Sequence, residues 1–138
     1  LVEAHDNFEQ MNFPELFIFN YRFVPRAVRE RLDSLVRDFD NPNEKKRTAA
    51  EVRVRRINHL LNQLNIELHR AIRQEDNSFV SRTILESTRY APQNIVVLRS
   101  LTINPLTTSD ILREIIDEQN MLGLKIYKND FEKQIENV

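Results

Sequence analysis

The 138-residue chain has a formal net charge of -1, with 41% hydrophobic and 30% charged residues, a balance typical of folded globular proteins and not of disordered ones. It contains no cysteine, which excludes disulfide frameworks, cysteine metal sites and thiol catalysis. A single glycine excludes glycine-rich phosphate loops and, with five prolines, favours helices over a many-stranded sheet. No apolar run reaches the roughly 18 residues of a membrane span, so we expect no membrane partner.

Residues 1–12 are polar and acidic and are predicted to be a loosely held lead-in. Residues 13–138 are expected to form a single helical domain. Because the chain does not start with methionine, we expect it to be excised from a larger protein of the cytoplasm, the nucleus or a virion interior. Asn12 and Pro14 predict a short helix start, followed by the nearly continuous apolar run from Leu16 to Phe23, which we expect to be buried.

A long helical hairpin is the central prediction. Apolar residues at helical spacing predict a helix over 26–39, and Asn-Pro in the segment that follows predicts a loop. Thr48 and Glu51 have the spacing of a capping box, which predicts a helix over 48–73. Steps of four and three residues define the apolar seam of this helix: Ala50, Val54, Ile57, Leu61, Leu64, Leu68 and Ala71.

Shorter elements are expected to pack against this hairpin. Residues 79–90 are predicted to be helical, whereas residues 94–103 fit either a strand or a helix. Ser109 caps a helix over 110–121, and Gly123 occupies the position of a left-handed helix end. Residues 124–127 are then a candidate strand, followed by a terminal helix. The fold class predicted is mainly α, with a small two-stranded β element if 94–103 pairs with 124–127.

A basic stretch carries a local charge of +5 between residues 45 and 56, where Glu51 is the one acid. Clustered cations of this kind suit phosphate backbones or an acidic protein surface. The candidate anion- or partner-binding residues are Lys45, Lys46, Arg47, Arg53, Arg55 and Arg56.

Amides flank the apolar seam and form a second candidate site. Polar amides beside a coiled-coil-like seam can select a partner and fix its register. His59 and His69 are ten residues apart, which is not the i, i+4 spacing of a helical zinc site, so no metal is expected. The candidate interface residues are Asn58, Asn62, Asn65 and His69.

These features favour a non-enzymatic protein–protein interaction or oligomerisation module. A homodimer is plausible because the acidic helix 110–121 of one copy complements the basic 45–56 region of another. The alternative is a polyanion-binding domain for RNA, DNA or acidic protein tails, which uses that basic region. No catalytic residue or cofactor is predicted, because the carboxylates and histidines are scattered.

Overall fold

A four-stranded antiparallel sheet forms the base of the computed structural model, which describes residues 5–11, 18–74, 80–87, 89–90, 93–101 and 109–138. The strands are β1 (Phe8–Gln10), β2 (Ile18–Phe23), β3 (Val80–Ser87) and β4 (Gln93–Leu101). Their order in the sheet is β1-β2-β4-β3, so the two central strands come from distant parts of the chain. β3 and β4 pair over eight residues, from Val80 opposite Ser100 to Ser87 opposite Gln93.

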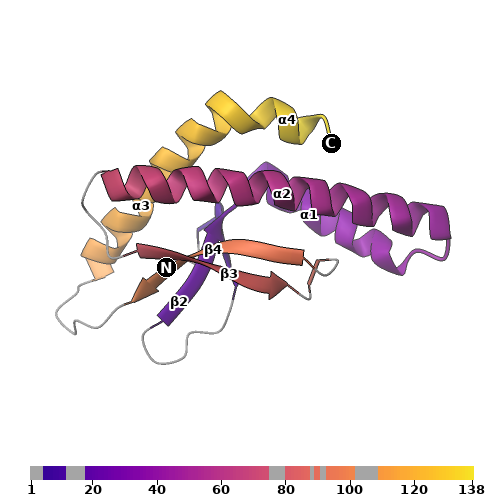
Figure 1. Ribbon diagram of the computed structural model, residues 1–138, viewed down its shortest axis with the longest axis horizontal. Helices are drawn as coiled ribbons and strands as arrows, with labels where there is room; N and C mark the ends of the chain where they lie inside the picture. Colours follow the sequence, from indigo (N-terminus) through magenta and orange to yellow (C-terminus); the bar gives the residue numbers. More distant parts are fainter. Residues whose placement is uncertain (1–4, 12–17, 75–79, 88, 91–92, 102–108) are drawn as a thin grey trace.

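The helices gather on and around the long helix α2 (Glu44–Gln74). α1 (Arg26–Arg37) lies beside α2, and α3 (Ser109–Ile126) crosses it (Figure 1). A π-helical segment, Tyr127–Phe131, links α3 to the short α4 (Glu132–Glu136). α2 also contacts β4 and β3, so it is the element that joins the sheet to the other helices. Within the described residues, no helix is both long enough and apolar enough to cross a membrane.

The apolar seam of α2 is the centre of the core. Val54, Ile57, Leu61, Leu64 and Leu68 are fully buried, and Ala50 is nearly so. Burying a Leu, Ile or Val side chain contributes roughly 1.5–3 kcal/mol, so this helix face makes a large contribution to the stability of the fold. At 31 residues and 1.5 Å per residue, α2 is about 46 Å long.

The sheet corrects the predicted fold class. A mainly α hairpin with a two-stranded element is wrong, because four antiparallel strands are present beside the long helix. Residues 80–87 were expected to be helical and instead form a strand. Their β-branched residues suit extended backbone, and eight consecutive pairs with β4 supply hydrogen-bond partners that a local pattern cannot reveal. The segment 94–103 was left open between strand and helix. Residues 94–101 belong to β4, and residues 102–103 lie outside the described residues.

The apolar run before Pro25 is also extended. β2 takes up residues 18–23 of it, whereas Leu16 and Phe17 lie outside the described residues. A strand covered on both faces has a nearly continuous apolar sequence, which resembles a buried helix when periodicity alone is considered.

Two helix boundaries and one candidate strand differ from the expectations. α2 begins four residues before Thr48, because the Asn43 side chain accepts a hydrogen bond from the Lys45 amide at 3.0 Å and thereby caps the helix earlier. Gly123 does not end α3. It lies buried inside the helix, against the ring of Phe23. The candidate strand 124–127 is therefore wrong, since the helix continues through it.

Candidate functional site

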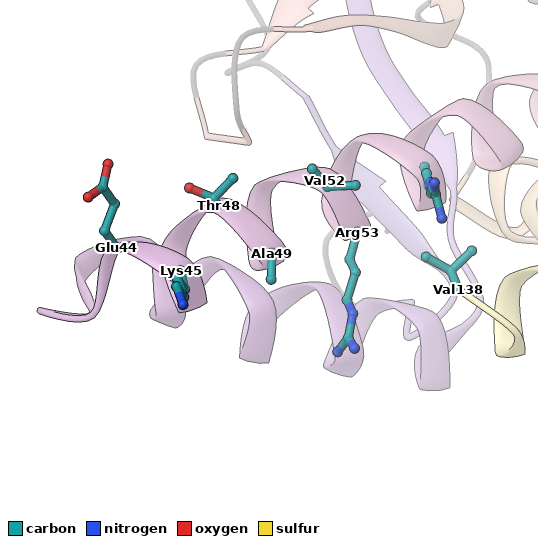
Figure 2. Close-up of a pocket in the computed structure, with 8 residues that line it drawn as sticks. Glu44, Lys45, Thr48, Ala49, Val52, Arg53 and Val138 are labelled. Carbon is teal, nitrogen blue, oxygen red and sulfur yellow. The ribbon is translucent and has the colours of Figure 1, made fainter.

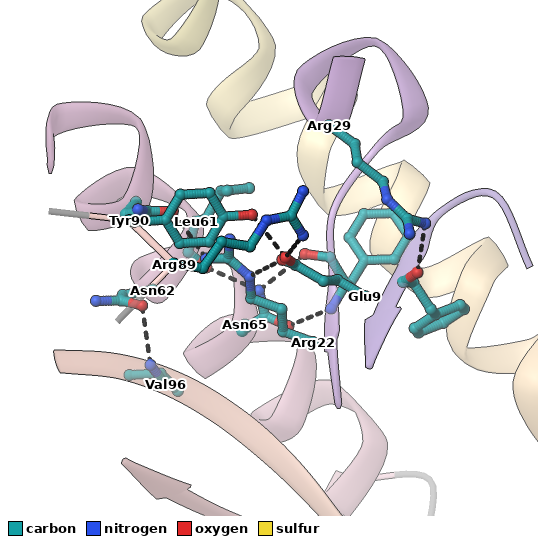
Figure 3. A network of polar contacts seen from close by, with 12 residues as sticks. Glu9, Arg22, Arg29, Leu61, Asn62, Asn65, Arg89, Tyr90 and Val96 are labelled. Carbon is teal, nitrogen blue, oxygen red and sulfur yellow. Dashed lines mark hydrogen bonds and ion pairs between the residues drawn. The ribbon is translucent and has the colours of Figure 1, made fainter. Parts of the chain in front are cut away.

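The amides along α2 turn inward and pair with strand backbone. The Asn65 side chain accepts from the Phe23 N–H at 2.8 Å and donates to the Phe23 carbonyl at 3.0 Å. The Asn62 side chain repeats this arrangement on β4, donating to the Asn94 carbonyl and accepting from the Val96 N–H, both at 2.9 Å (Figure 3). Each amide therefore substitutes for one residue of a neighbouring strand.

The reason lies in the divergence of β2 and β4. Their pairing covers β4 residues 98–101, from Leu98 opposite Tyr21 to Leu101 opposite Ile18. Beyond Tyr21 the two strands separate, and backbone groups on the facing edges need other partners. α2 occupies this space. Asn62 and Asn65, predicted as interface residues, satisfy the two edges from the helix.

The other two predicted interface residues are buried. Asn58 is completely buried and accepts from Arg22 Nη1 at 2.9 Å. His69 is 8% exposed, and its Nε2 lies 3.2 Å from the Val80 carbonyl of β3. The structure thus directs all four predicted side chains toward strands of their own chain.

A buried ionic network connects β1, β2 and the segment before β4 (Figure 3). Glu9 is 3% exposed and accepts three hydrogen bonds: from Arg22 Nε at 2.8 Å, from Arg89 Nη1 at 2.8 Å and from the Tyr90 hydroxyl at 2.6 Å. Arg89 also pairs with Asp33 of α1. The network therefore ties the edge strand and α1 to the chain that leads into β4.

Electrostatics in this network keep Glu9 ionised. Burial by itself raises the pKa of a carboxyl group, but the attraction of Arg22 and the hydrogen bond from Tyr90 outweigh it, so the pKa of Glu9 is lowered. Burial raises the pKa of Tyr90 to about 12. Arg22 Nη2 and Asn58 Nδ2 are buried without a hydrogen-bond partner among the described residues. Sequence reasoning missed this network because Glu9 lies in the segment expected to be a lead-in.

The predicted basic residues lie along the first half of α2. All six are exposed except Arg47, which is half-buried and donates to the Asn41 carbonyl at 2.9 Å. Lys45, Arg53 and Arg56 line an open hollow of about 690 Å³ that Val138 also borders (Figure 2). The structure thus brings three of the six predicted cations to one surface and leaves their proposed ligand a prediction.

A second hollow, of about 380 Å³, lies where the end of α2 meets β3. Its lining carries three guanidinium groups and an imidazole, from Arg70, Arg73, Arg82 and His69, together with Gln74. Burial lowers the pKa of His69, opposed by the hydrogen bond to the Val80 carbonyl and reinforced by the charges of Arg82 and Arg73.

Arg99 is the third cationic feature. It is half-buried on the central strand β4, and its Nε donates to Asn20 Oδ1 on β2 at 3.2 Å. Other half-buried arginines donate hydrogen bonds from Nη1 to backbone carbonyls: Arg29 to that of Phe8, and Arg31 to that of Ile135. In the described part of the chain, no acceptor lies within hydrogen-bond distance of the Nη groups of Arg99. The hydrogen bond at Nε orients the guanidinium group, and its two Nη groups have the geometry to bind a carboxylate through two hydrogen bonds.

No group of three or more histidine or acidic side chains suited to a metal ion occurs among the residues that the structure describes. The two hollows and Arg99 are cationic features. The sequence did contain a signal for this, since arginine outnumbers lysine by fifteen to five, and arginine is the better residue for planar recognition of carboxylate and phosphate.

Comparison with known proteins yields one informative relative. No protein-family model matches the chain, and no solved structure matches it. The chain is 34% identical over 123 residues to an aspartate 1-decarboxylase of Aliivibrio fischeri (strain ATCC 700601 / ES114). The match covers 89% of this chain and 20% of that protein, so the chain spans about a fifth of the length of the relative.

This similarity overturns the functional expectation. The predicted non-enzymatic interaction or oligomerisation module, its polyanion-binding alternative and the absence of enzyme activity are all wrong by this finding. A small mixed α/β protein related to an enzyme replaces the helical scaffold. Composition and periodicity did not reveal this because they describe how a chain folds, whereas chemistry depends on side chains that only the tertiary structure assembles.

Proposed function

We propose that this chain is one domain of an amino-acid decarboxylase that acts on a small acidic amino acid such as aspartate. The observation that carries the proposal is the 34% identity over 123 residues with an aspartate 1-decarboxylase. Because the matched segment is 20% of that protein, the remaining catalytic machinery is expected to lie outside this chain. The contribution of this domain is then to hold substrate and to support the active site structurally.

The reaction constrains which substrate group a cation should hold. Removal of the C1 carboxylate breaks the bond between C1 and Cα, releases CO2, and leaves an electron pair on Cα that takes up a proton. The C1 carboxylate loses its charge as it becomes CO2, so a cation bound to it would stabilise the substrate more than the transition state. The C4 carboxylate keeps its charge throughout. A cation there gains orientation without raising the barrier.

Arg99 is the residue of this chain that we assign to the C4 carboxylate. Its guanidinium is held at Nε by Asn20 at 3.2 Å, and a sheet positions both residues. A guanidinium group that is already fixed at Nε loses little conformational freedom when its two Nη groups bind a carboxylate. Partial burial strengthens such a pair compared with one in open solvent.

The activity itself is tested with the complete product of the gene that encodes this chain. Extracts of cells that overproduce it retain any small molecule the reaction needs. Aspartate labelled with carbon-14 at C1 should release labelled CO2, whereas aspartate labelled at C4 should not. Extracts of the same cells without the gene set the background. Absence of release from C1-labelled aspartate and glutamate alike would refute the proposed function.

The role of Arg99 is tested in the same assay by Arg99→Gln. A charge-assisted bond contributes about 1.5–3 kcal/mol, so kcat/KM for aspartate should fall by about 10- to 100-fold. Arg37→Gln, which alters an exposed guanidinium in the last turn of α1, is the matched control and should leave kcat/KM unchanged. Equal activity of the two variants would remove Arg99 from the site and leave the decarboxylase assignment standing.

A further inference from the structure

We propose that the hollow between the end of α2 and β3 binds a small dianionic oxyanion, such as a phosphate-bearing or dicarboxylate metabolite. The term α2–β3 hollow is used below for the site lined by His69, Arg70, Arg73, Gln74 and Arg82. This proposal does not depend on the decarboxylase assignment, because none of its residues is involved in the argument for Arg99.

The first observation is that arginine side chains from α2 and β3 line the same hollow. Arg70 pairs with Glu67 at 2.9 Å, but the two side chains are 63% and 45% exposed, so solvent weakens this ion pair. For Arg73 and Arg82, no carboxylate lies within ion-pair distance in the described part of the chain. Two guanidinium groups therefore line one space, and the described residues place no carboxylate between them.

The stability of the fold accounts for one of these two cations but not for the other. A cation in the last turn of a helix is favourable because the helix dipole is negative there, which accounts for Arg73. Arg82 belongs to a different element. It lies on β3 opposite Leu98 of β4, and the helix dipole does not require a cation at that position. An anion that binds both side chains would give each a partner.

The size and lining of the hollow fit a small ligand. Its volume of about 380 Å³ is at the lower end of the range for small-molecule sites and exceeds what one water molecule needs. His69 is buried in the lining of the hollow, and its Nε2 lies 3.2 Å from the Val80 carbonyl oxygen. Charged groups that face it are Arg73 from α2 and Arg82 from β3, both of which lower its pKa. A bound dianion would offset these charges and raise that pKa.

A second histidine on α2 supplies an internal comparison. His59 is exposed on the same helix, ten residues from His69, and its ring lies 3.2 Å from the Gln63 amide. It reports general effects of salt on an imidazole of α2. His69 reports the α2–β3 hollow. A ligand that binds specifically in the α2–β3 hollow should shift the NMR signals of the His69 ring and not those of the His59 ring.

The experiment titrates the chain with sulfate and, separately, with succinate, at constant ionic strength maintained with sodium chloride. Sulfate is a dianion from pH 5 to 8, so its own charge does not change during a histidine titration. We expect saturable shifts of the His69 ring signals and an upward shift of its pKa. Because binding and protonation are linked, sulfate should bind more tightly at pH 5.5 than at pH 7.5.

Variants then identify the groups responsible. Arg82→Gln and Arg73→Gln should each weaken binding about tenfold, the value expected for loss of one charge-assisted bond. Arg37→Gln should have no effect, and thermal melting confirms that every variant is folded. Saturation by sulfate alone would assign a phosphoryl-type ligand, and saturation by succinate a dicarboxylate. Shifts that do not saturate, that follow ionic strength alone, or that persist in both arginine variants would overturn the proposal.

Discussion

Replacement of the one glycine by alanine tests the packing between α3 and β2. A Cβ atom added to Gly123 would lie 2.7 Å from Cδ2 and Cε2 of Phe23 and 2.9 Å from Cγ. Comfortable carbon–carbon contacts are about 3.5–4.0 Å, so the methyl group and the ring cannot both keep their places. The Phe23 ring is completely buried and packs edge-on against Phe8, with centroids 5.6 Å apart, so it has little room to move.

Two effects of opposite sign determine how much Gly123→Ala changes the free energy of unfolding. Inside a helix alanine is favoured over glycine by about 1 kcal/mol, which by itself would stabilise the variant. Overpacking of a filled core costs about 1–3 kcal/mol, and the short distances to three ring atoms place this site toward the upper end. We expect Gly123→Ala to lower the free energy of unfolding by about 1–2 kcal/mol. For a chain of this size, that lowers Tm by about 4–8 °C.

Urea denaturation measures this difference, and a double-mutant cycle assigns it to the ring. Phe23→Leu replaces a rigid ring by an aliphatic side chain that can adopt another rotamer. In that background Gly123→Ala should be neutral or stabilising, which reverses its sign. An increase in stability of Gly123→Ala in the otherwise unchanged chain would refute the reasoning, because the helix would then tolerate a Cβ at its contact with β2.

Three further predictions concern the interior. Asn65→Ala leaves the N–H and carbonyl of Phe23 without their side-chain partner, so we expect a loss of about 2–4 kcal/mol and faster hydrogen exchange of the Phe23 amide; unchanged exchange would contradict the strand-substitute role. Folding lowers the pKa of Glu9, so its ionised carboxylate stabilises the fold above about pH 4.5, and this stabilisation is lost as the pH falls through the folded pKa. Glu9→Gln should therefore lower the free energy of unfolding by about 3 kcal/mol at pH 7. The stability of this variant should also depend less on pH in the acid range. Leu64→Ala should cost about 2–5 kcal/mol in urea denaturation, whereas Val52→Ala on the exposed side of α2 should change stability by less than about 0.5 kcal/mol; similar values for both would show that the apolar seam is not the core.

The long helix shows what local sequence determines. A seam with steps of three and four residues fixes both the helical state and the buried face, because side chains three and four apart lie on one side of a helix. The structure buries six of its seven members fully or nearly so, and Ala71 is half-buried. The helix start was less predictable, since Asn43 and Thr48 are both able to cap and the choice depends on the turn before the helix.

Strands and sites depended on contacts between distant residues. Val80–Ser87 becomes a strand because β4 pairs with it, and the amides beside the seam become strand substitutes because β2 and β4 diverge where α2 passes. The same holds for Glu9, which is buried only because Arg22, Arg89 and Tyr90 converge on it.

By itself the sequence determined the amphipathic rod at the centre of the protein, because helix periodicity is a property of neighbours along the chain. It also determined the excess of arginine over lysine. The tertiary structure alone decided which arginines are buried and which groups lie beside them, since the sheet brings Asn20 to Arg99 and β3 brings Arg82 to the end of α2. Burial and charge pairing are properties of the assembled chain, and they govern the chemistry of each side chain.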